Sequence, residues 1–174
     1  MNKKIIFLIL VVSTIYFIGK MTAGAIKIPD EAIRIRVIAN SNINYDQQMK
    51  LKVSSNLQQE IYDLLKNAED IETARRIIKD NMNRLDNNVR MTLLKNNYAI
   101  SYSINFGQNY FPKKEFKGIT YDEGYYESLV VSLGEGKGDN WWCVLFPPLC
   151  LLEAEESDEV EYKFFVQELI EKYF

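Results

Sequence analysis

The spacing of apolar residues changes midway along this 174-residue chain. From Met49 to Leu93 apolar residues recur every three or four positions, which is the spacing of one helix face. From Ile100 to Leu133 they mostly alternate with polar residues, which is the spacing of strands with one buried face. Helical spacing in the first half and strand spacing in the second are typical of an α+β domain.

The predicted element order is β-α-α-β-β-β-β-α, an α+β two-layer sandwich with a mainly antiparallel sheet and two long helices. Asp46 and Asp70 are the expected caps of the long helices, which should end near residues 67 and 96. A turn is expected between Gly107 and Pro112, and the glycine-rich loop 134–140 is expected to connect a hairpin. The predicted strands cover residues 33–39, 100–106, 116–121, 126–133 and 141–146, and a final helix covers 160–174.

Residues 1–25 are expected to lie outside the fold. An uncharged run of 15 residues, Ile5 to Gly19, is shorter than the roughly 20 apolar residues that span a bilayer. Ala23 and Ala25 fit the small-x-small pattern that precedes signal cleavage. We interpret the segment as a signal peptide cleaved after Ala25. An uncleaved N-terminal membrane anchor and a buried core helix are the alternatives.

If residues 1–25 direct export, the rest of the chain crosses the membrane. Residues 26–152 would then form an exported α+β domain, and residues 153–174 an acidic linker with an amphipathic helix. Outside the cytoplasm Cys143 and Cys150 can oxidise to a disulfide that closes a short loop. Two buried thiols that pack as small apolar groups are the alternative.

The composition argues against several classes of enzyme. Histidine is absent, which excludes His-based catalytic triads and His-ligated metal sites. The 21 basic and 24 acidic residues leave no basic excess for nucleic acid. The glycine loop is not a phosphate-binding loop, because Gly138 and not Ser or Thr follows Lys137. We therefore expect no catalytic residue, metal, cofactor, nucleic acid or small-molecule substrate, and predict that the chain is not an enzyme.

A partner-binding surface is expected at two loops and a pair of tryptophans. Consecutive strand residues point to opposite faces, so one tryptophan should point outward as an anchor beside the glycine loop. Capping and turn chemistry would explain the Asn and Ser residues equally well. The predicted partner-binding residues are Asn40, Ser41, Asp46, Gly136, Lys137, Gly138, Asn140, Trp141 and Trp142.

An exported cell-wall hydrolase or carbohydrate-binding module is the alternative function. Asp122, Glu123 and Glu127 could supply a carboxylate pair, although most such acids are solvated surface groups. The sequences Trp141-Trp142 and Tyr125-Tyr126 could form a sugar-stacking face. A third possible function is that of a purely structural envelope protein. Such a protein would be present in stoichiometric amounts, whereas a signalling protein would be present in traces.

Two sequence blocks resemble the stage II sporulation protein R family of endospore-forming bacteria. The first, residues 34–53, reads RIRVIANSNINYDQQMKLKV, and the second, residues 133–150, reads LGEGKGDNWWCVLFPPLC. The resemblance extends over about residues 30–152. This chain departs from the family pattern at Asn42, where an acidic residue would be expected.

The resemblance implies a signalling protein that the forespore exports into the space between the forespore and mother-cell membranes. There it would activate a mother-cell membrane aspartyl protease that processes pro-sigma-E, and it would need no active site of its own. If uncleaved, its N-terminal segment would also contact the membrane. The resemblance implies no particular binding residues, so those named above rest on their chemistry alone.

Overall fold

The computed structural model describes residue 4 and residues 28–116, 119–151 and 159–174. The predictions for the N-terminal segment, including Ala23 and Ala25, and for the acidic stretch 152–158 lie outside these residues. None of the helices within the described ranges is long and apolar enough to cross a membrane.

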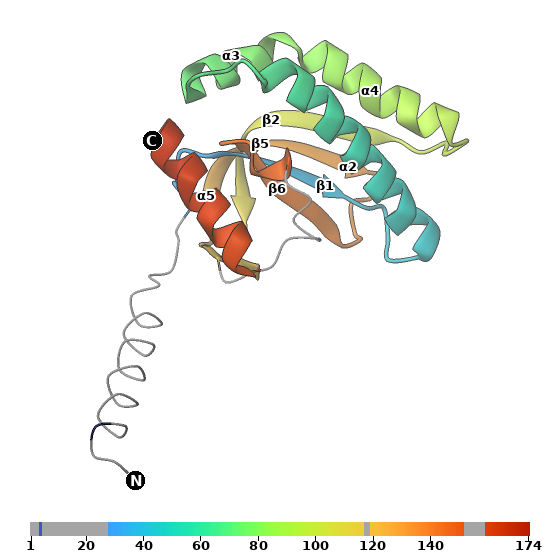
Figure 1. Ribbon diagram of the computed structural model, residues 1–174. Coiled ribbons are helices and arrows are strands. Elements are labelled where there is room, and N and C mark those ends of the chain that lie inside the picture. Colours follow the sequence, from blue (N-terminus) through green and yellow to red (C-terminus); the bar gives the residue numbers. More distant parts are fainter. Residues whose placement is uncertain (1–3, 5–27, 117–118, 152–158) are drawn as a thin grey trace.

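The described residues form an α+β fold, which confirms the predicted class (Figure 1). The first half contains one strand and three helices, and the second half contains five strands and the last helix. The elements are β1 (Ile33–Ile38), α2 (Asn44–Leu65), α3 (Ile71–Asp80), α4 (Met82–Lys95), β2 (Tyr102–Phe111), β3 (Lys114–Phe116), β4 (Ile119–Tyr121), β5 (Gly124–Leu133), β6 (Asn140–Phe146), the 3-10 turn η1 (Leu149–Leu151) and α5 (Glu159–Tyr173).

The main sheet is mixed and has the strand order β2-β5-β1-β6. β1 is parallel to β5, with Ile35 opposite Leu129, and antiparallel to β6, with Ile35 opposite Cys143. β2 is antiparallel to β5. Because β1 lies between β5 and β6, the glycine loop does not close a hairpin, and that prediction is wrong. The loop instead crosses the end of β1.

The main core lies between one face of this sheet and the helices. Ile33, Ile35 and Val37 of β1 are fully buried in a cluster with Leu57 of α2 and Leu85 of α4. Figure 1 shows α2, α3 and α4 together on one side of the sheet. The alternate residues of each strand face the other side, where a smaller core contains residues of the 28–32 segment, β4, β6 and α5.

Three local predictions are corrected. The second long helix is two helices that meet at Asn81, whose side chain and backbone N–H both donate to the carbonyl of Ile77. Gly107 lies inside β2 and not in a turn. The single strand predicted over 116–121 is instead the β3–β4 pair, a separate two-stranded sheet.

Candidate functional site

Two loops meet at the sheet edge where the parallel strands β1 and β5 end. Residues 39–43 leave β1 toward α2, and residues 134–139 leave β5 and cross to β6. The backbone N–H groups of Lys137 and Gly138 donate to the carbonyls of Asn40 and Ala39, at 3.1 and 2.9 Å. We call residues 39–43 and 134–139 together the double loop. The structure therefore brings together the two loops predicted from the sequence.

Two asparagine side chains connect the halves of the double loop. Asn40 Oδ1 accepts a hydrogen bond from the backbone N–H of Glu135 at 3.0 Å, and Asn42 Oδ1 accepts one from the backbone N–H of Asp139 at 2.7 Å. The Asn42 amide also donates to the Asp139 carboxylate at 3.3 Å. A carboxylate at position 42 would face that of Asp139, so the neutral side chain suits this loop.

Glycine is required at particular points of the double loop. Gly134 and Gly136 have φ angles of 56° and 62°, in the left-handed region that favours glycine. A Cβ on Gly138 would lie 2.4 Å from the backbone oxygen of Ser41. The close approach of the two backbones therefore depends on the missing side chain at residue 138.

Asp46 secures the double loop to the first turn of α2. The helix cap is Ile43, without a side-chain hydrogen bond, so the prediction that Asp46 caps this helix is wrong. The buried Asp46 carboxylate instead accepts from Ser41 Oγ at 2.6 Å, the Tyr98 hydroxyl at 2.6 Å and Asn40 Nδ2 at 2.8 Å. These bonds, Ser41 first, lower the pKa of Asp46, while burial and the Asp46 carboxylate raise the pKa of Tyr98.

Lys50 of α2 donates a hydrogen bond to the double loop. Its buried ammonium donates to the backbone oxygen of Asp139 at 3.3 Å and to Gln47 Oε1 at 2.6 Å. Burial lowers the pKa of Lys50, and the nearby Asp139 opposes that shift. A charged donor on a helix thus fixes the far end of the glycine loop.

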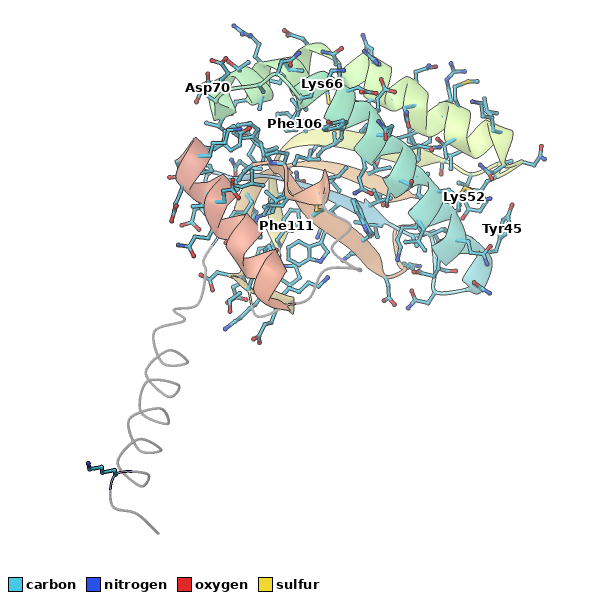
Figure 2. All side chains as sticks on the ribbon, in the orientation of Figure 1. Tyr45, Lys52, Lys66, Asp70, Phe106 and Phe111 are labelled. Carbon is cyan, nitrogen blue, oxygen red and sulfur yellow. A yellow bond between two sulfur atoms is a disulfide. The ribbon has the colours of Figure 1, made fainter. Side chains whose placement is uncertain are left out.

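The exposed surface beside the double loop combines apolar and charged groups. Ile43 and Tyr45 are 60% and 51% exposed, and Figure 2 shows Tyr45 at the outer end of α2. Lys137 Nζ lies 2.7 Å from a carboxylate oxygen of Glu135, and both side chains are largely exposed. Exposed apolar side chains on a hydrogen-bonded frame are suited to contact with another protein.

The two tryptophans are not surface anchors. Trp141 and Trp142 do point to opposite faces of β6, but both are half-buried. Trp141 packs against the main core, while the Trp142 ring centroid lies 5.3 Å from that of Phe111 and 5.5 Å from that of Tyr121. The tryptophans thus point in opposite directions as predicted, and the one on the far face, Trp142, is half-buried against the second core. Asn140, at the start of β6, is exposed.

A disulfide joins β6 to the turn that follows it. Cys143 and Cys150 are bonded, with their Cα atoms 5.7 Å apart. Gln58 of α2 donates to the backbone oxygen of Cys150 at 2.8 Å. The segment after β6 is thus attached to β6 by the disulfide and to α2 by the hydrogen bond from Gln58.

The acids of the alternative function contact different side chains of the fold. Glu127 accepts two hydrogen bonds from Nε of Arg75, at 2.6 and 2.8 Å, and the Glu123 carboxylate accepts from the Tyr110 hydroxyl at 3.2 Å. At Asp122, the backbone carbonyl accepts from the hydroxyl of the buried Tyr126 at 3.0 Å. Within the described ranges, no group of three or more Cys, Asp or Glu residues could hold a metal ion.

The four residues of the expected sugar-stacking face do not share one exposed surface, because Tyr126 is buried and packs with Trp142 against Phe111. Tyr125 is 73% exposed and pairs with Tyr110 on the neighbouring strand, with ring centroids 5.6 Å apart. The tyrosine pair lies on β2 and β5, whereas both tryptophans lie on β6. Because β1 lies between β5 and β6, the tryptophans are not on a strand next to this pair.

Sequence reasoning missed three residues of the site: Tyr98, Lys50 and Asp139. Tyr98 lies 52 positions from its partner Asp46, outside both sequence blocks, so no local signal pointed to it. Lys50 and Asp139 do lie in the blocks that carry the family resemblance, and their presence there was the available signal.

The fold and the site define an α+β domain in which two distant sequence blocks form one loop surface. The family model described as Stage II sporulation protein R matches residues 29–156, and the chain belongs to this family. Stage II sporulation protein R of Bacillus subtilis (strain 168) is 39% identical over 134 residues, which cover 77% of this chain and 60% of that relative. The chain thus spans about three-fifths of the length of this curated relative. No solved structure matches it.

Family membership supports a role in sporulation, and the family is not a known enzyme family. The match covers both loops of the site and all strands of the main sheet.

Proposed function

We propose that this protein is an exported signal of sporulation that activates a mother-cell membrane aspartyl protease for pro-sigma-E processing. It would leave the forespore and act in the space between the two membranes, without an active site of its own. The observation that carries this proposal is the double loop. The two sequence blocks that resemble the family meet there in one hydrogen-bonded surface, through side-chain contacts between residues 95 and 97 positions apart.

The preorganised loop surface fits an activator. An activator must bind the active form of its target more tightly than the inactive form, because equal binding shifts no equilibrium. A shift from 1:99 to 99:1 needs about 5.5 kcal/mol of differential affinity. Asn40, Asn42 and Asp46 already hold the loops in place, so binding loses little conformational entropy.

A reconstitution tests the proposal. The full chain, the protease and pro-sigma-E are expressed together in a host that does not sporulate, and processing is followed on a gel. We expect cleavage that requires this protein and also requires residues 1–25. Absence of cleavage, with all three proteins present and correctly located, contradicts the proposal and favours the cell-wall alternative, for which peptidoglycan binding is the assay.

The same assay tests the exposed surface. Ile43→Ala combined with Tyr45→Ala removes two exposed side chains, of which Tyr45 also packs its ring against that of Tyr98, with centroids 5.3 Å apart. We expect processing to fall at least tenfold, an effect of about 1.4 kcal/mol or more on binding. Leu51→Ala is the matched control, since Leu51 is 54% exposed on the same helix. Equal processing by the double variant and the control contradicts the assignment of this surface.

A further inference from the structure

Positively charged side chains surround aromatic rings on the face of the sheet opposite α2 and α4. Arg34 and Arg36 alternate with the core residues of β1, so they point to this face. Figure 2 shows Phe111 on this side of the sheet. We call the group the basic–aromatic cluster, and its members are Arg34, Arg36, Phe111, Lys114, Tyr126 and Trp142.

The cations stack on ring faces within the cluster. Cζ of Arg34 lies 3.3 Å from the ring centroid of Tyr126 and 5.6 Å from that of Phe111. Cζ of Arg36 lies 4.9 Å from the Phe111 centroid. Nζ of Lys114 lies 4.9 Å from the ring centroid of Trp142, the residue opposite Arg36 in the β1–β6 register. The cluster is thus continuous from β5 to the edge strand β6.

Arg34 lacks the anion that a buried guanidinium normally binds. Its side chain is 0% exposed, and Nε, Nη1 and Nη2 have no hydrogen-bond partner. Nε of Arg36 is also buried without a partner. Tyr126 favours the charged form of Arg34 most, followed by Tyr121 and Asp30. Ring stacking offsets only part of the desolvation of a buried charge, so the vacant donors require another explanation.

Burial outweighs the contributions of Tyr126, Tyr121 and Asp30, which favour the charged form of Arg34. Burial lowers the pKa of Arg34, Arg36 and Lys114, and the charge of Lys50 further lowers that of Lys114. The ion pairs resolved between described residues include none of the three cations of the cluster, Arg34, Arg36 and Lys114. A negatively charged group placed among these cations would favour their charged forms and so oppose the effect of burial on their pKa values.

We propose that the basic–aromatic cluster binds the carboxylate of an acidic side chain on an extended segment of a protein partner. A guanidinium matches a carboxylate with two parallel hydrogen bonds, and the aromatic rings suit the methylene stem of a glutamate. β6 is an edge strand of the sheet, so an extended segment can pair with it and direct alternate side chains toward Trp142. Because Arg34 is fully buried, binding requires neighbouring side chains to move.

The partner under the proposed function is the membrane protease, so this assignment of the partner rests on that proposal. The carboxylate site itself does not, because it follows from Arg34 and its neighbours.

Tryptophan fluorescence of the purified full chain measures binding. Trp141→Phe leaves Trp142 as the single tryptophan. The probe is the peptide acetyl-Thr-Glu-Val-Glu-Thr-amide, and its Gln counterpart is the matched neutral peptide. We expect a saturable change in emission with the Glu peptide and at least tenfold weaker binding of the Gln peptide. Equal binding of the two peptides, or no saturable response, overturns the proposal.

Variants identify the residue responsible. In the same background Arg34→Met should abolish the response to the Glu peptide without lowering the unfolding midpoint, because it removes an unpaired buried charge. Lys79→Met on α3 is the control with the same change of charge, and should bind like its parent. Should Arg34→Met fail to fold, Lys114→Met takes its place, with binding expected at least threefold weaker. Unchanged binding in the folded variants overturns the proposal.

The processing assay separates this inference from the proposed function. Processing lost together with peptide binding in Arg34→Met supports the protease as the partner. Processing retained by a variant that no longer binds the peptide contradicts that partner and leaves the signalling proposal intact. Absence of processing with the unmodified chain contradicts the proposed function, while peptide binding still decides whether the carboxylate site exists.

Discussion

Asp46 connects three parts of the chain through a single carboxylate. Replacing it with Asn leaves one acceptor oxygen for the donors of Asn40, Ser41 and Tyr98. We expect Asp46→Asn to lower the free energy of unfolding by about 2 kcal/mol, since buried donors lose their partners. Urea denaturation measures this loss. Asp80→Asn, on an exposed residue of α3, should change the midpoint little, and an equal effect of both substitutions contradicts the argument.

The lowered pKa of Asp46 also predicts how stability depends on pH. Its folded-state pKa lies below the ordinary value of 3.8, so its contribution to stability is present above that value. The contribution is lost as pH falls through the lower folded pKa. The stability difference between the unmodified chain and Asp46→Asn should therefore shrink from about pH 5 to about pH 2. Urea midpoints of both proteins across this range measure it, and a constant difference contradicts the shift.

Gly138 tests whether the double loop needs close backbone contact. A methyl group there would lie 2.4 Å from a backbone oxygen of Ser41, which cannot rotate away as a side chain could. We expect Gly138→Ala to cost about 1–3 kcal/mol of stability and to reduce processing. Gly107→Ala is the matched control, because a Cβ on Gly107 meets nothing within 4 Å. Similar unfolding midpoints for the two variants would show that the loops can separate without cost.

Sequence reasoning located the residues of the site better than their roles. Asn40, Ser41 and Asp46 are predicted from the sequence as partner-binding residues, and they do lie in one hydrogen-bonded group. The cap role of Asp46 was wrong because its carboxylate is taken by Tyr98 and the loop. That partnership depends on packing between distant segments, which local patterns do not record.

At the scale of elements, periodicity predicted most strands and helices but not their pairing. The alternation in β2 was visible because one face packs against the core. The apolar stripe continues from Ile78 to Leu85 across the break at Asn81, so spacing alone predicted one helix. The insertion of β1 between β5 and β6 joins residues 94 to 113 positions apart, and a one-dimensional pattern carries no signal for it.

The disulfide between Cys143 and Cys150 stabilises a single element, the turn that follows β6. Replacing Cys143 and Cys150 with Ser opens a loop of about eight residues, for which loop-closure entropy predicts a loss of about 2.5 kcal/mol. Urea midpoints with and without dithiothreitol measure the effect. The reductant should lower the midpoint of the unmodified chain and leave the double variant unchanged, since these are the two cysteines of the sequence. An unmodified chain insensitive to reductant contradicts this contribution.

At the scale of the whole molecule, α5 helps to enclose the second core, and the sequence places this helix after the acidic linker that follows residues 26–152. Val166 is fully buried in the cluster that contains Ile119 and Val144, and the ring of Tyr173 packs against Phe146, with centroids 4.8 Å apart. The second core therefore draws on both ends of the described domain, since Ile28 lies in the same cluster.

Truncation tests whether residues 26–152 are stable without this helix. Removing residues 153–174 uncovers the second core, and each buried aliphatic side chain is worth about 1.5–3 kcal/mol. We expect a clearly lower unfolding midpoint for the truncated chain. Val166→Ala should account for about 2 kcal/mol of the loss, whereas Gln167→Ala, exposed on the same helix, should stay within about 0.5 kcal/mol. A truncated chain as stable as the full chain would mean that α5 contributes no net stability, and the boundary at residue 152 would then be a true domain end.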